Sequence, residues 1–266
     1  MELTNRRGII TGAGQGIGQA LALEFAAKGG HLLLVGRTEE TLKETANLVK
    51  SVGGSAEVLV QDLSEPEAVG HVVEAVKSWP TVDLLVNNAG NVRAGRLELS
   101  NEAEVRSMID LNLTAPILLT RALLPQLRSS GAESGSLTLN ISSEIALVAM
   151  PFYAVYAATK SGLASFGESL RRELHGTGVH VATVYPGATD TNMMSSQNAD
   201  WERRSVAAVV ADVMAGLMAG DHEINASAED ARGMQDLNAS DPLAVDAAIA
   251  PGLGDLEAAV RDHNSI

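Results

Sequence analysis

Short apolar runs alternate with longer amphipathic stretches along the first 190 residues of the chain. The runs are apolar on both faces, as expected for parallel strands that helices cover on both sides. They predict strands at Gly8 to Ile10, His31 to Val35, Ala56 to Val60, Asp83 to Val86, Ser136 to Ile141 and Val179 to Val184. The stretches between them predict helices at Ile17 to Lys28, Glu39 to Val52, Glu65 to Ser78, Glu102 to Arg128 and Tyr156 to Leu174. Right-handed βαβ crossovers then give an α/β fold with a doubly wound parallel sheet, a three-layer αβα sandwich.

The chain beyond the sixth strand is less regular. A helix from Arg203 to Ala219 and a short strand from Asp221 to Asn225 are expected there, and prolines then separate short helices. No linker interrupts the chain, so we expect a single domain over residues 1–266. Within it we expect a mobile substrate lid and helix at 195–220 and an atypical acidic C-terminal tail at 221–266.

Length, charge and residue counts narrow the classes of function. One α/β domain of 266 residues can bury a substantial core. The net charge of -14 disfavours a nucleic-acid partner, because phosphate backbones are bound through clustered Lys and Arg. The chain has no Cys, and its six His lack HExxH-like spacing, so no metal site is expected. No apolar window approaches the length of a membrane span, which favours a cytoplasmic location without a membrane partner.

A glycine-rich segment, Thr11-Gly-Ala-Gly-Gln-Gly-Ile-Gly18, lies between the first strand and the first helix. Glycines let the backbone turn sharply, and the free N–H groups of the helix N-terminus can then face a pyrophosphate. A glycine-rich turn alone could be purely structural, but its place at the start of the sheet favours a dinucleotide site. At the end of the second strand an acidic residue would bind the 2'-hydroxyl of NAD, whereas Arg37 suits the 2'-phosphate of NADP. We therefore expect NADP(H) as the preferred cofactor, with NAD(H) as the alternative.

A second cluster follows the fifth strand and consists of Ser143, Tyr156 and Lys160. Tyr156 and Lys160 are four residues apart on a helix, so the ammonium should favour the phenolate and lower the pKa of Tyr156 from its reference of about 10. Such a tyrosine can act as a general acid or base. Each residue alone could be structural: a half-buried aromatic, a surface charge and a helix cap. Their combination downstream of a nucleotide loop indicates catalysis.

These segments together resemble the single-domain branch of the short-chain dehydrogenase/reductase family, with its Rossmann-like fold and its TGxxxGxG and YxxxK motifs. Further matches in the family's order and spacing are Asp62-Leu63, Asn87-Asn-Ala-Gly90, Asn112, Pro186-Gly187 and Thr191. The resemblance covers about Arg7 to Met194. It implies an NAD(P)-dependent oxidoreductase that transfers a hydride between nicotinamide and a ketone, an aldehyde or a secondary alcohol.

The resemblance also implies a role for each matching residue. Ser143 would hydrogen-bond the substrate oxygen, and Tyr156 would exchange the proton. Lys160 would bind the nicotinamide ribose and tune Tyr156, while Asn112 would anchor a relay water where the long helix is locally disturbed. The expected cofactor-binding residues are Thr11, Gly12, Gly14, Gln15, Gly16, Ile17, Gly18, Arg37, Asp62, Leu63, Asn88, Ala89, Gly90, Tyr156, Lys160, Pro186, Gly187, Thr189 and Thr191. The expected substrate-pocket residues are Ser143, Ile145, Met150, Tyr153, Met193 and Met194.

Two positions and the C-terminal segment depart from the family pattern. Many NADP-preferring relatives have a basic residue where this chain has Gln15, and many relatives have an aliphatic residue in place of Thr189. Many tetrameric relatives end in a strand, whereas this chain continues from Asp221 into the acidic tail. We therefore expect a homodimer built from the helices near Asn101 and Tyr156, with a homotetramer as the alternative.

Other interpretations fit parts of the pattern. A non-catalytic NAD(P)-sensing or scaffold protein could use the same fold, but the intact catalytic set argues against it. An epimerase or dehydratase of the extended branch would have different glycine spacing and a longer substrate region. Tyr153 competes with Tyr156 for the proton-transfer role, but the residue four positions after Tyr153 is Ala157 rather than a lysine. The mostly apolar pocket residues favour a hydrophobic small-molecule substrate.

Overall fold

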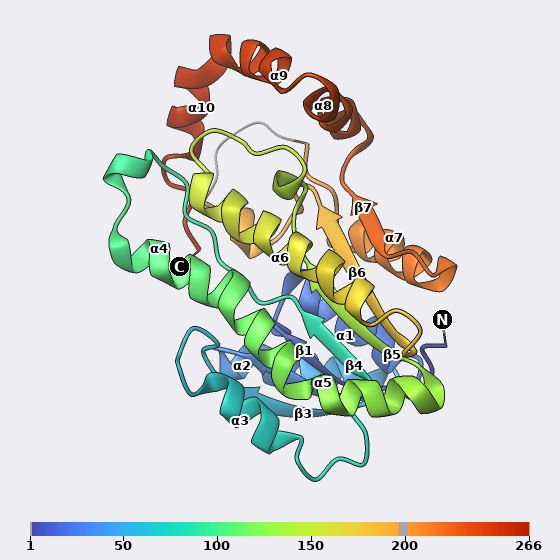
Figure 1. The fold of residues 1–266 in the computed structure, drawn as a ribbon. Coiled ribbons are helices and arrows are strands. Elements are labelled where there is room, and N and C mark those ends of the chain that lie inside the picture. Colours follow the sequence, from blue (N-terminus) through green and yellow to red (C-terminus); the bar gives the residue numbers. More distant parts are fainter. Residues whose placement is uncertain (1, 197–201, 266) are drawn as a thin grey trace.

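The computed structural model describes residues 2–196 and 202–265, and their strands form one parallel sheet in the order β3-β2-β1-β4-β5-β6-β7 (Figure 1). The strands are β1 Arg7–Thr11, β2 His31–Gly36, β3 Ser55–Val60, β4 Leu84–Asn87, β5 Ser136–Ile141, β6 Val179–Pro186 and β7 Glu223–Ala226. Every predicted strand is confirmed to within two residues at each end. The strand order reverses between β1 and β4, so the carboxyl ends of these strands open into a crevice that suits ligand binding.

Helices cover both faces of this sheet. They are α1 Gly16–Ala26, α2 Glu39–Ser51, α3 Ala68–Ala75, α4 Glu102–Ile109, α5 Ala115–Ser134, α6 Ala154–Glu173, α7 Val206–Ala219, α8 Glu229–Ser240, α9 Pro242–Ile249 and α10 Leu253–Val260. Apolar residues of α1, α2 and α7 pack against one face, and those of α3 and α5 pack against the other. The predicted three-layer sandwich is thereby confirmed.

One strand departs from the expected pattern of burial. The predicted strand Ala56 to Val60 was expected to be apolar on both faces, yet β3 is partly exposed along its length. Its position explains the difference, since β3 lies at the edge of the sheet and pairs only with β2 among the described residues. The expectation of two covered faces is therefore wrong for this edge strand.

The long helix expected from Glu102 to Arg128 is interrupted and longer than predicted. A π-helical turn, Asp110–Thr114, joins α4 to α5, so the expected local disturbance at Asn112 is present. The helix continues through Pro125, which lies on its exposed side, where water can satisfy the carbonyl that the missing N–H leaves unpaired. It ends before Gly135, whose φ of 80° suits glycine.

The same helix contradicts the prediction that no apolar segment approaches the length of a membrane span. The continuous stretch Glu102–Ser134 is long and apolar enough to cross a membrane by length and composition, so the statement that no window approaches that length is wrong. Its apolar side, including Leu119, Leu123 and Leu127, is buried against the sheet. Burial of that kind is what a core helix of an α/β domain requires.

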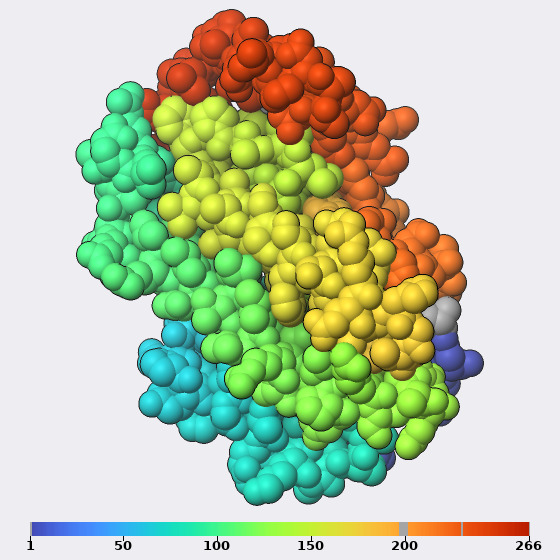
Figure 2. Space-filling model, in the orientation of Figure 1, coloured from blue at the N-terminus to red at the C-terminus, as the bar shows by residue number. Residues whose placement is uncertain are grey.

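The acidic tail has a defined structure in the described residues. β7 extends the sheet beside β6, and α8, α9 and α10 then follow one another over the end of the molecule where the strands finish (Figure 1). In Figure 2 the same segment, in red, forms the rim above the yellow α6. The chain finally runs back beside residues 92–94, where Arg93 and Asn264 form an antiparallel bridge. The tail is thus part of the domain and not an appendage.

Candidate active site

A cavity of about 600 Å³ lies at the carboxyl ends of the strands. It extends from the glycine-rich loop after β1 to the C-terminal tail. The predicted residues that line it are Gly12, Gly14, Gln15, Gly16, Ile17, Arg37, Asp62, Leu63, Asn88, Ala89, Gly90, Ser143, Ile145, Met150, Tyr153, Tyr156, Lys160, Pro186, Gly187, Thr189, Thr191, Met193 and Met194. The structure therefore brings the predicted cofactor and substrate residues to one site.

Three predicted residues, Thr11, Gly18 and Asn112, lie behind the wall and do not line the cavity. The Thr11 hydroxyl donates to the carbonyl oxygen of Val86 at 3.1 Å and accepts the amide N–H groups of Asn88 and Ala89. It fastens the segment after β4 to the segment after β1. The Thr11 side chain therefore shapes the cavity. Because its hydroxyl is already bonded to protein groups, this geometry does not favour a direct contact with the cofactor.

The glycine-rich loop is packed too tightly to accept larger residues. Gly12 has a φ of 63°, and a Cβ atom there would lie 2.8 Å from the Asn88 amide nitrogen. A Cβ atom at Gly18 would lie 2.3 Å from the carbonyl oxygen of Gly12. These distances require glycine, because real Cβ contacts are longer.

The N-terminus of α1 meets the requirements of an anion site. The helix begins at Gly16, has no side-chain cap and carries no acidic residue in its first turn. Its first N–H groups and the positive end of its dipole thus face the cavity without a competing carboxylate. The loop and helix together fit the diphosphate of a nicotinamide dinucleotide.

Arg37 follows β2 and is exposed at the rim of the cavity, with Thr38 and Thr41 beside it. Asp62 follows β3, and its carboxylate accepts hydrogen bonds from the backbone and hydroxyl of Ser64 at 2.9 and 2.7 Å. Leu63 is buried next to it. These side chains form the end of the cavity that an adenosine would occupy.

Ser143, Tyr156 and Lys160 lie together where the two halves of the cavity meet. Ser143 follows β5, and its hydroxyl lies near enough to the Tyr156 hydroxyl to favour the phenolate. Lys160 is buried, and its ammonium lies 5.8 Å from the centre of the Tyr156 ring. The same ammonium donates to the carbonyl oxygen of Ile141 at 2.9 Å. One helix face therefore presents Tyr156 and Lys160 to the serine, as their spacing predicted.

The prediction that the pKa of Tyr156 lies below its ordinary value is wrong for the chain alone. Burial raises the pKa of Tyr156 to about 12; the hydrogen bond with Ser143 opposes this shift, and the nearby Glu144 carboxylate adds to it. Burial also lowers the pKa of Lys160 to about 8. For both groups the removal of water on burial is the largest cause of the shift in pKa.

Asn112 is fully buried in the π-helical turn. Its amide nitrogen donates to the carbonyl oxygen of Asn91 at 2.8 Å and to the hydroxyl of Thr159 at 3.2 Å. Its amide oxygen accepts the backbone N–H of Asn91 at 2.8 Å. The side chain thus joins the segment after β4 to α6, one residue away from Lys160.

Tyr153 lies in the substrate half of the cavity. Its hydroxyl is hydrogen-bonded to Nδ1 of His263 at 2.6 Å, and its ring meets that of Tyr156 edge to face at a centroid distance of 6.4 Å. Burial raises the pKa of Tyr153 well above its ordinary value. Tyr153 therefore forms part of the pocket wall, as the absence of a lysine at position 157 indicated.

The tail supplies cavity residues that the sequence reasoning missed. They are Ala228, Ala231, Met234, Gln235 and His263. The family motifs end before this region, and its Ala/Asp-rich composition carries no signal for a ligand. The amphipathic spacing of Ala231, Met234 and Gln235 on one helix could have indicated a packed face, but not the cavity that it faces.

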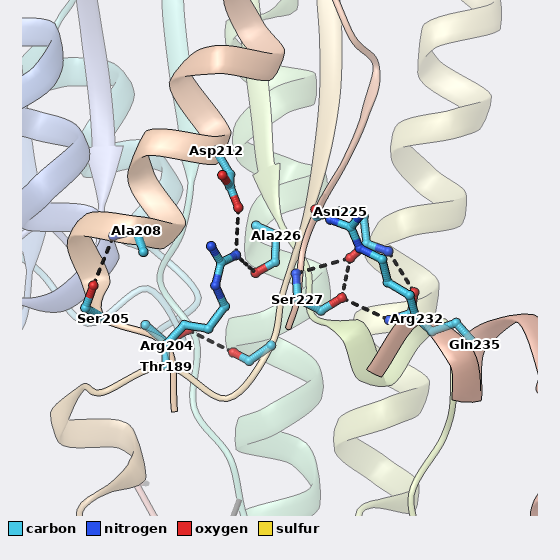
Figure 3. A network of polar contacts seen from close by, with 11 residues as sticks. Thr189, Arg204, Ser205, Ala208, Asp212, Asn225, Ala226, Ser227, Arg232 and Gln235 are labelled. Atoms are coloured by element: carbon cyan, nitrogen blue, oxygen red, sulfur yellow. Dashed lines mark hydrogen bonds and ion pairs between the residues drawn. The ribbon is translucent and has the colours of Figure 1, made fainter. Parts of the chain in front are cut away.

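A network of polar contacts fixes α8 to the sheet (Figure 3). The guanidinium of Arg204 donates to Asp212 at 2.6 Å and to the carbonyl oxygen of Ala226 at the end of β7 at 2.8 Å. Next along the chain, Asn225 donates to Gln235 of α8 at 2.7 Å. Gln235 in turn donates to Ser227 at 3.1 Å. The position of α8 over the cavity is thus determined by contacts with β7.

The predicted lid is described only in part. Met193 and Met194 form a 3-10 turn after β6, and Asn192 beside them donates to the side chain of Gln15 at 2.6 Å. This contact joins the segment after β6 to the glycine-rich loop. Residues 197–201, which belong to the predicted lid and helix at 195–220, lie outside the described residues.

Comparison with known proteins identifies the family. The sequence profile of the short chain dehydrogenases matches residues 7–202. The chain belongs to this family. A relative from Thermotoga maritima, named an uncharacterized oxidoreductase, is 34% identical over 183 residues, which are 69% of this chain and 71% of that protein. Two other curated relatives are matched over only 64% and 52% of their own lengths.

Solved structures agree with the fold. A short-chain dehydrogenase from Sphingobium yanoikuyae in complex with NADPH superposes with a TM-score of 0.79 at 27% identity, covering 88% of this chain and 93% of that one. A bulky-bulky ketone specific alcohol dehydrogenase from Comamonas testosteroni gives 0.77 at 25% identity, covering 88% and 91%. The short-chain dehydrogenase described here is thus an NAD(P)-dependent oxidoreductase, as the motifs indicated.

Proposed function

We propose that this dehydrogenase interconverts a hydrophobic ketone or aldehyde and the corresponding alcohol, with Tyr156 exchanging the proton. The observation that carries this proposal is the proximity of the Ser143 and Tyr156 side chains in a cavity that joins an anion-binding loop to an apolar pocket. A carbonyl oxygen placed between the two hydroxyls would receive two hydrogen bonds. Both would strengthen as negative charge develops on that oxygen.

The nicotinamide, when bound, supplies the hydride chemistry, and the protein supplies orientation and the proton. The glycine-rich loop and the start of α1 would hold the diphosphate. Asn88, Ala89 and Gly90 would line the ribose and nicotinamide side, opposite Pro186, Gly187, Thr189 and Thr191. The packing around Gly12 and Gly18 supports this assignment, because the loop leaves space only for backbone groups to face the ligand.

Tyr156 is suited to act as the acid in carbonyl reduction. A pKa of about 12 keeps its hydroxyl protonated at neutral pH, so it can donate to the oxygen that receives charge. Lys160 would bind the ribose hydroxyls, and its ammonium beside the phenol would stabilise the phenolate left after transfer. Asn112 would act as a positioning residue, since its amide already makes three hydrogen bonds to protein groups.

We propose NADP(H) as the preferred cofactor. Arg37 lies at the rim beside Thr38, and neither of these two positions directly after β2 is acidic. A guanidinium there can bind a 2'-phosphate, which NAD lacks. The structure neighbours include proteins whose complexes contain NADPH or NADP, which is consistent with the proposal.

The proposed substrate is an apolar, fairly large carbonyl compound. Ile145, Val148, Met150, Met193, Met194 and Met234 line the far half of the cavity. Thioether side chains adapt to irregular apolar shapes. The similarity to the bulky-ketone dehydrogenase from Comamonas testosteroni supports the same class.

The test is a panel of aliphatic and aryl ketones, aldehydes and secondary alcohols with each nicotinamide cofactor, followed by absorbance at the nicotinamide band. We expect turnover of bulky apolar ketones with NADPH. Tight NADPH binding without turnover of any compound would instead support the scaffold or sensor alternative. A preference for small charged carbonyls would contradict the proposed substrate class.

A further inference from the structure

The end of the chain joins two loops that border the cavity. The backbone N–H of Ala94 donates to the carbonyl oxygen of His263, and that of Ser265 donates to the carbonyl oxygen of Val92, both at 3.0 Å. On the other side, the backbone N–H of Asn264 donates to the Ser196 hydroxyl at 3.1 Å. Three consecutive residues, 263–265, therefore connect the loop after β4 to the loop after β6.

His263 is the residue of this segment that enters the cavity wall. It is 3% exposed although it is polar. Its Nδ1 is 2.6 Å from the Tyr153 hydroxyl, and its Nε2 is 3.0 Å from the carbonyl oxygen of Met193. One imidazole thus bonds two residues of the substrate half of the cavity, from two different loops.

The partners of the ring determine its tautomer. A carbonyl oxygen only accepts, so Nε2 carries the proton and donates to Met193. In the neutral imidazole Nδ1 is then an acceptor, and the Tyr153 hydroxyl donates to it. Burial lowers the pKa of His263, which favours this neutral form. The Tyr153 hydroxyl thus donates its hydrogen bond to His263 of the tail. Tyr156 is then the tyrosine that remains to exchange a proton with the substrate.

Apolar packing and backbone conformation hold the same arrangement. Val260 is fully buried in a cluster with Tyr153, Ile145 and Val92, and Tyr156 packs against this cluster. Phe152, just before Tyr153, has a φ of 70°, an uncommon conformation for a residue with a side chain. Its carbonyl oxygen accepts the N–H of Gly95 at 2.8 Å. Contacts on all sides therefore fix Tyr153.

We propose that His263 is a positioning residue that determines substrate specificity by fixing Tyr153 and the Met193 loop as the outer wall of the substrate pocket. This inference rests on the proposed function for its kinetic readout. It assigns to the acidic tail a direct part in forming the pocket. Without the imidazole, the loop of Tyr153 after β5 and the loop of Met193 after β6 lose their shared partner. The wall that faces the outer part of a substrate then becomes more mobile.

The experiment compares His263→Phe, which keeps an aromatic ring, with His263→Asn, which keeps a short acceptor and donor. Tyr153→Phe removes the hydroxyl partner, and His175→Phe, at an exposed position near the amino end of β6, is the matched control. Each variant is assayed with a small and a bulky ketone. NADPH affinity, melting temperature and amide hydrogen exchange at residues 144–153 and 192–196, the two loops that the imidazole joins, are also measured.

For His263→Phe we expect KM for the bulky ketone to rise about 10-fold, while kcat for the small ketone and the NADPH affinity change less than about 2-fold. His263→Asn, whose shorter side chain can keep only the hydrogen bond with Tyr153, should recover part of the loss. Adding Tyr153→Phe to His263→Phe should cause little further change, because the two residues act as one unit. Exchange should become faster in both loops, and His175→Phe should resemble the parent protein.

Unchanged exchange in the two loops would overturn the proposal, whether or not the enzyme is active. So would a uniform loss with every substrate that tracks the melting temperature, because that pattern indicates a structural role only. If the parent protein reduces none of the carbonyls, the proposed function fails, and the exchange data still decide the role of His263.

Discussion

The two ends of the cavity are built differently. At the cofactor end, backbone N–H groups and glycines come from segments directly after strands, and close packing leaves little freedom there. At the substrate end, side chains from the loops after β5 and β6 meet α8 and the end of the chain. The first end is fixed by local backbone geometry, whereas the second depends on long-range contacts. Changes at the two ends should therefore have separable effects on cofactor and substrate.

The largest effect is expected where the two ends meet. Tyr156→Phe removes the proposed proton donor, so kcat should fall by about 10³-fold while NADPH still binds. Steady-state kinetics and nucleotide titration measure the two effects. Tyr153→Phe is the matched control, because its hydroxyl bonds to His263, and it should retain most of the kcat. Comparable losses in both variants would contradict the assignment of the proton to Tyr156.

At the cofactor end, Gly18→Ala should weaken NADPH binding by about 100-fold, because a misplaced loop loses several hydrogen bonds to the diphosphate. The added Cβ atom would lie 2.3 Å from the carbonyl oxygen of Gly12 and 2.4 Å from the Asn88 amide nitrogen. Isothermal titration with NADPH measures the loss. Gly70→Ala, where no atom lies within 4 Å of the new Cβ, should leave the affinity unchanged. An intact NADPH affinity in Gly18→Ala would show that the loop can relax.

At the substrate end, removal of residues 253–266 should lower kcat/KM for bulky ketones by about 30-fold, because the wall around Tyr153 loses its buried partners. The NADPH affinity should change little. The matched control is Leu243→Ala on α9, where the side chain is 73% exposed. A truncated protein that loses NADPH binding together with substrate would show that the two ends are not independent.

Cofactor choice should respond to one exposed side chain. Arg37→Ala should weaken NADPH by about 10-fold and NADH hardly at all, since only NADPH has the 2'-phosphate. Competition binding with both nucleotides gives the ratio. Arg121→Ala, at an exposed position of α5 that does not line the cavity, serves as the control for a lost positive charge. An equal change for both nucleotides would remove the basis for the proposed NADP preference.

The smallest effect concerns the buried ammonium of Lys160. Its pKa is lowered to about 8 in the folded chain, so between this pH and its ordinary pKa the unfolded chain binds more protons. The free energy of unfolding should then rise with pH relative to that of Lys160→Met, by about 1 kcal/mol from pH 8 to pH 9. Urea unfolding of both proteins across this range measures the difference. A flat difference would show that water reaches the ammonium.

The cofactor end could be predicted well because its signals are local. Gly12 is required by a turn and Gly18 by a close contact. Ser143 and Tyr156 are 13 residues apart, and one loop between a strand and a helix separates them. The pKa of Tyr156 could not be predicted in this way. The Tyr–Lys spacing indicates proximity, but burial, which depends on the tertiary packing, is the largest cause of the shift in the pKa of Tyr156.

The sequence by itself determined the fold, the order of the strands along the chain and the residues that meet at the nucleotide loop, because periodicity and short motifs act over neighbouring positions. Only the tertiary structure decided that the acidic tail returns to the cavity and that His263 lies 2.6 Å from Tyr153. The two residues are 110 positions apart. No local pattern encodes such a contact, since it depends on how three helices traverse the end of the sheet.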